Sequence, residues 1–93
     1  MRPTYRRFKE LKGKAQEVLN ESGKLEERLA NAICEVDLME EHEVLKHKWD
    51  SVQIIIKSCV THQPEGDEGI YRASINHKSY EELIALKRAI ELL

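Results

Sequence analysis

The chain has 93 residues, of which 41% are apolar and 34% charged, and its formal net charge is −2. A chain of this length forms one domain and buries only about 60–65% of its unfolded surface. No apolar run approaches the roughly 18–20 residues that span a bilayer, and no signal-peptide stretch follows the basic N-terminal segment. Cys34 and Cys59 have apolar neighbours, which suits buried reduced thiols. We therefore expect a cytoplasmic protein without a membrane span.

The first half of the chain shows a helical seam that begins at Phe8. Nine of its ten positions, spaced alternately by three and four, are apolar, which is typical of a helix packed on helices. The exception, Ser22, lies beside Gly23, and both residues favour a turn. We predict helices over 4–20 and from 24 onward, joined by a turn at 21–23. The seam comprises Phe8, Leu11, Ala15, Val18, Ser22, Leu25, Leu29, Ala32, Val36 and Met39.

Charge segregation supports an antiparallel hairpin at this turn. Residues 1–14 carry a net charge of +5 and residues 17–43 carry −7. A reversal near 22–23 sets the basic segment beside the acids of 35–43, whereas other pairings oppose like charges.

A second seam continues the pattern but is out of phase with the first. Its members are Leu38, His42, Leu45, Trp49, Val52, Ile56 and Cys59. Two consecutive steps of three, from Met39 to Leu45, form a stammer or mark a change of packing partner. We predict one central helix over 24–62.

Residues 52–62 allow two interpretations. Their β-branched side chains favour a strand, which would pair with residues 70–75 in a hairpin and give an α+β fold. Most of the apolar side chains nevertheless share one helical face, and only Ile54 lies far from it. We favour the helix and keep a hairpin at 52–75 as the alternative.

The last part of the chain contains a loop and a short helix. Pro64, Gly66 and Gly69 predict a break, so we assign residues 63–78 to a loop. Ser79 and Glu82 have the spacing of a capping box, which predicts a helix over 79–92.

These elements define an all-α single domain with coiled-coil-like packing. A helix over 24–62 would be about 58 Å long, and two shorter helices along it would leave apolar seams uncovered. We expect a second copy to cover them in a homodimer. The expected interface residues are Leu25, Leu29, Val36, Met39, Leu45, Trp49, Val52 and Ile56.

Signals for chemistry are sparse. Cys59 and His62 have the spacing of half a zinc site, which His77 and Cys34 could complete, but zinc sites usually show two paired clusters. We favour a buried thiol and a surface imidazole, and we expect no metal and no cofactor. No nucleophile motif, P-loop or dinucleotide fingerprint is present. The sequence therefore predicts a non-enzymatic protein.

The basic N-terminal segment is the strongest functional signal. Its cations suit either the acids of 35–43 or nucleic-acid phosphates. We predict a helical protein–protein interaction module that acts as an adaptor, assembly factor or small regulator. The alternative is a small nucleic-acid-binding regulator that uses Arg2, Arg6, Arg7, Lys9, Lys12 and Lys14.

Overall fold

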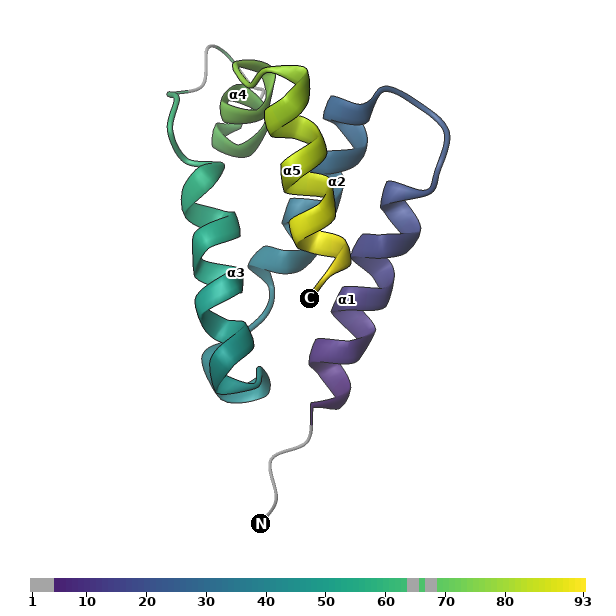
Figure 1. Ribbon diagram of the computed structural model, residues 1–93, viewed down its shortest axis with the longest axis vertical. Coiled ribbons are helices and arrows are strands. Elements are labelled where there is room, and N and C mark those ends of the chain that lie inside the picture. The colour runs from purple at the N-terminus through teal and green to yellow at the C-terminus, as the bar shows by residue number, and fades with distance from the viewer. Residues whose placement is uncertain (1–4, 64–65, 67–68) are drawn as a thin grey trace.

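The computed structural model describes residues 5–63, 66 and 69–93. Within these residues the chain forms five α-helices and one 3₁₀ turn, and no strand (Figure 1). The all-α class is therefore confirmed, and the strand alternative at 52–75 is wrong for the described residues. The elements are α1 (Arg6–Leu19), α2 (Leu25–Asp37), η1 (Glu41–Glu43), α3 (Lys46–Ser58), α4 (Ile70–Asn76) and α5 (Tyr80–Glu91).

The turn between α1 and α2 forms where the sequence predicts it. Gly23 adopts a φ of 123°, a conformation that favours glycine. The Arg28 guanidinium donates a 2.7 Å hydrogen bond to the carbonyl of Leu19, one of the orphan acceptors at the end of α1. The two helices then run antiparallel and pack against each other (Figure 1).

The continuous helix expected over 24–62 does not form. α2 ends at Asp37 and α3 begins at Lys46, with η1 between them. Met39 and Val44, on either side of η1, are buried. The phase slip explains the break, because two out-of-phase seams on one straight helix cannot both face the same core. Separating them lets α3 fold back so that Val52 and Cys59 of the second seam reach the core, while Leu38 and His42 stay exposed.

The segment expected as a loop over 63–78 contains α4, and its residues 64–65 and 67–68 lie outside the described part of the chain. This helix has only seven residues and packs against α2, with Ala73, Ser74 and Ile75 buried. The Ser74 hydroxyl accepts hydrogen bonds from the amides of Thr61 at 2.9 Å and His62 at 3.1 Å. Tertiary contacts of this kind, rather than local propensity, account for a helix so short.

Helix α5 forms as expected and closes the fold. Both hydrogen bonds of the predicted capping box between Ser79 and Glu82 are present. Leu83, Leu86 and Ile90 are buried, and α5 packs against α1, α2 and α3. The side-chain amide of Gln16 on α1 also donates to the carbonyl of Glu91 at 3.0 Å.

A single chain therefore builds one continuous core to which every described α-helix contributes, α4 through Ile75. The expectation that the helices leave their apolar seams uncovered is wrong, because five short helices bury or partly bury most seam residues. The single chain already has a hydrophobic core, so a lack of buried apolar surface gives no reason for dimerisation. No helix in the described part of the chain is long and apolar enough to cross a membrane.

Candidate interaction surface

The eight residues expected at a dimer interface lie mainly inside the chain. Leu29, Val36, Met39 and Val52 are buried, and Leu25, Leu45, Trp49 and Ile56 are partly buried. This corrects the expected site for the four buried residues, which belong to the core of a single chain. An apolar contact with another chain would need side chains that are more exposed.

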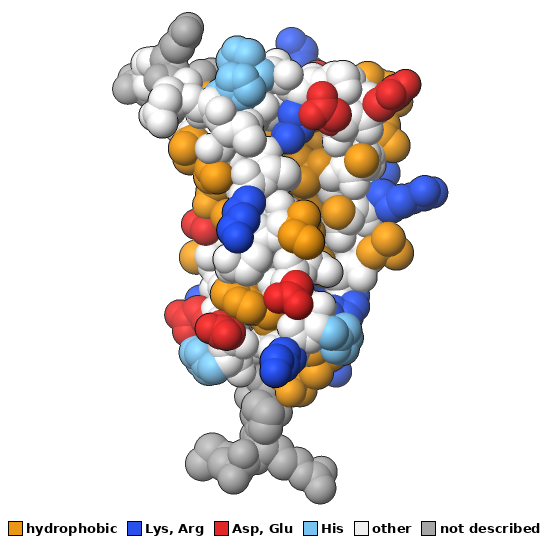
Figure 2. Space-filling view, turned by 60° about the vertical axis from the view of Figure 1, so that its left-hand side comes forward, with side chains coloured by type: hydrophobic (Ala, Val, Ile, Leu, Met, Phe, Trp, Pro, Cys, Tyr) orange, Lys and Arg blue, Asp and Glu red, His pale blue; other side chains and the backbone are white. Residues whose placement is uncertain are grey.

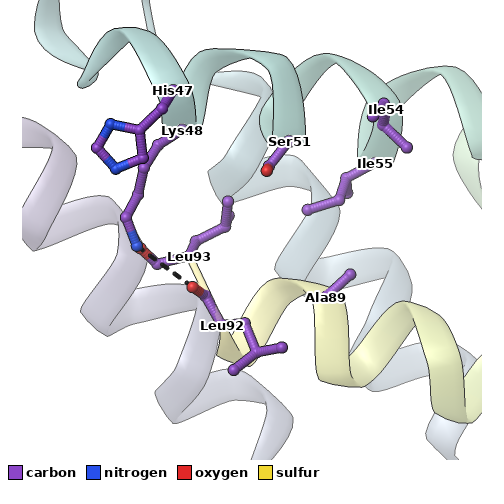
Figure 3. A pocket seen from close by; sticks show the side chains of 8 residues that line it. All are labelled: His47, Lys48, Ser51, Ile54, Ile55, Ala89, Leu92 and Leu93. Atoms are coloured by element: carbon purple, nitrogen blue, oxygen red, sulfur yellow. Dashed lines mark hydrogen bonds between the residues drawn. The ribbon is translucent and has the colours of Figure 1, made fainter.

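Apolar surface remains exposed between α3 and α5. Two adjacent hollows of about 290 Å³ and 260 Å³ lie between these helices and share Ile54, Ile55 and Ala89. Ile54 on one side is 67% exposed, and Leu92 on the other is 72% exposed. We call this surface the α3–α5 groove. Figure 3 shows its first hollow, with α3 contributing the larger share of the lining.

Small side chains keep the groove open. Ser51 and Ser58 line it from α3, and Ala85 and Ala89 line it from α5. At one end the Lys48 ammonium donates hydrogen bonds to the carbonyls of Leu92, at 3.3 Å, and of Leu93 (Figure 3). These bonds satisfy acceptors at the end of α5 and tie that end to α3.

Charged side chains also line the groove: Lys48 lies at the first hollow, and Lys78 and Glu82 lie at the second. Asp50 and Lys57 on α3 and Glu81 and Arg88 on α5 are exposed but line neither hollow. Figure 2, which turns α3 toward the viewer, shows hydrophobic side chains interspersed with charges of both signs. A surface of this kind combines apolar contact area with groups that select a partner.

The four residues that were weighed as a zinc site, and not favoured, show no metal-binding arrangement. The rings of His62 and His77 stack with centroids 4.0 Å apart and an interplanar angle of 5°. Their nitrogen lone pairs lie in nearly parallel planes and therefore do not point at one ion. Burial raises the pKa of the Cys59 thiol, which disfavours the thiolate that zinc binds. Cys34 is exposed.

A different group of possible metal ligands lies at η1. The ligand atoms of Glu40, His42 and Glu43 are within 4.8 Å of one another. The His42 and Glu40 side chains are both exposed and lie 3.5 Å apart, and Glu43 lies 3.8 Å from Arg7. Glu40 and His42 are ordinary exposed side chains and Glu43 already contacts a cation, so we assign no metal to this group.

The basic N-terminal residues do not form one stripe. Arg6 pairs with Glu10 at 3.4 Å, and Arg7 pairs with Glu43, which belongs to the acidic region expected to face it. Lys9 and Lys14 are exposed and Lys12 is partly buried. At about 100° per residue, Lys9 and Lys14 lie on different sides of α1, with Glu10 and Glu17 between them. Arg2 lies outside the described residues.

Comparisons with known proteins add no assignment: no family model, curated protein or solved structure matches this chain. The class that its own features define is a small all-α domain with an apolar interhelical groove. Sequence analysis missed this groove, although one signal for it was present. Ile54 is a large apolar residue that lies away from the inward face of its helix. An apolar side chain in that position contributes to another surface of the protein.

Proposed function

We propose that this protein is a non-catalytic helical interaction module, acting as an adaptor, assembly factor or small regulator, and that it self-associates through the α3–α5 groove. The observation that carries the proposal is the exposure of Ile54 and Leu92 on either side of an apolar hollow. Large apolar side chains that flank a groove are typical of surfaces that another helix covers.

A standard interface removes about 800 Å² from each partner. That is about one eighth of the 6375 Å² that the chain exposes, so a dimer of this kind must cover surface beyond the two hollows. Burying apolar area yields about 25 cal/mol per Å², against a substantial entropic cost of association. We therefore expect a dimer that dissociates at micromolar concentrations rather than an obligate one.

The test is the solution mass as a function of protein concentration, measured by light scattering or sedimentation. We expect Ile54→Glu to shift the equilibrium to monomer, because it places a charge in the apolar contact. Tyr80→Glu is the matched control, since Tyr80 is 72% exposed but lies on the opposite flank of α5 from Ala85 and Leu92. A wild-type chain that stays monomeric at millimolar concentration contradicts the proposal, as does an equal effect of both variants.

The nucleic-acid alternative receives no comparable support. Two of the six candidate cations form ion pairs within the chain, and the exposed lysines of α1 do not share a face. We therefore do not propose it.

A further inference from the structure

We draw no further inference here: the strongest candidate, the apolar α3–α5 groove, belongs to the site already described, and nothing in the structure shows what covers it.

Discussion

The Ser74 hydroxyl holds the segment after α3 against α4, and its removal gives a localised prediction. Ser74 is completely buried, and its oxygen accepts hydrogen bonds from the amides of Thr61 and His62. A hydrogen bond contributes about 1 kcal/mol net. Thr61 and His62 are themselves exposed, so water can replace part of the lost bonding. We therefore expect Ser74→Ala to lower the free energy of unfolding by about 1–2 kcal/mol, which corresponds to roughly 5–15 °C in Tm.

Urea denaturation measures the stability change, and amide hydrogen exchange locates it. Exchange at Thr61 and His62 should accelerate more than exchange in α1. Ser58→Ala is the matched control, because the Ser58 hydroxyl donates to the carbonyl of Ile55 within its own helix, at 2.8 Å. That substitution should change stability by less than about 0.5 kcal/mol. Equal losses for the two variants, or unchanged exchange at residues 61–62, would refute the reasoning.

Three further predictions concern single groups. Burial and a hydrogen bond to Asp37 raise the pKa of Tyr71 to about 12, so its stabilising contribution is complete below pH 10 and is lost as the pH rises through 12. An absorbance titration checks this: Asp37→Asn should lower the pKa of Tyr71, while burial should keep it above the ordinary value. Ser79→Ala should cost about 1 kcal/mol of stability through loss of the N-cap, measured by denaturation. Gly23→Ala should destabilise the fold by about 1 kcal/mol because of its positive φ, whereas Gly13→Ala, with open space around its Cβ, should stabilise it by a similar amount.

Local signals in the sequence were sufficient for the outer parts of the fold. Gly23 after a polar stretch marked the turn between α1 and α2, and the Ser79–Glu82 spacing marked the start of α5. Both signals determine the structure of residues that lie within a few positions of them in the sequence. The all-α class followed from the helical periodicity of the apolar residues.

The break between α2 and α3 and the existence of α4 depended on tertiary contacts. The phase slip near Met39 was visible in the sequence. Whether such a slip bends a helix or ends it depends on the free energy that α3 gains by packing on the core. α4 is stabilised by buried contacts to α2 and by the Ser74 hydroxyl, whose partners lie twelve and thirteen residues away. Neither outcome can be derived from a local window.

The candidate site was the least predictable feature. Seam residues such as Leu29 and Val52 belong to the strongest hydrophobic pattern of the sequence, and for that reason they are buried in the core. The groove instead depends on Ile54 and on the spacing left by small residues of α5. A surface of this kind becomes visible only after the inward-facing residues have been assigned.

The packing of α5 against α1 and α2 has a consequence for biosynthesis. Ile90 and Leu93 fill the core beside helices from the first half of the chain, and Gln16 bonds directly to α5. The ribosome covers the most recently made residues, so α1 and α2 emerge well before α5 can reach them. Until then their apolar faces remain uncovered, and isolated helices of 13 or 14 residues are only marginally stable in water. Folding of this domain is therefore expected to wait for α5, and the apolar faces of α1 and α2 stay exposed until that helix has emerged.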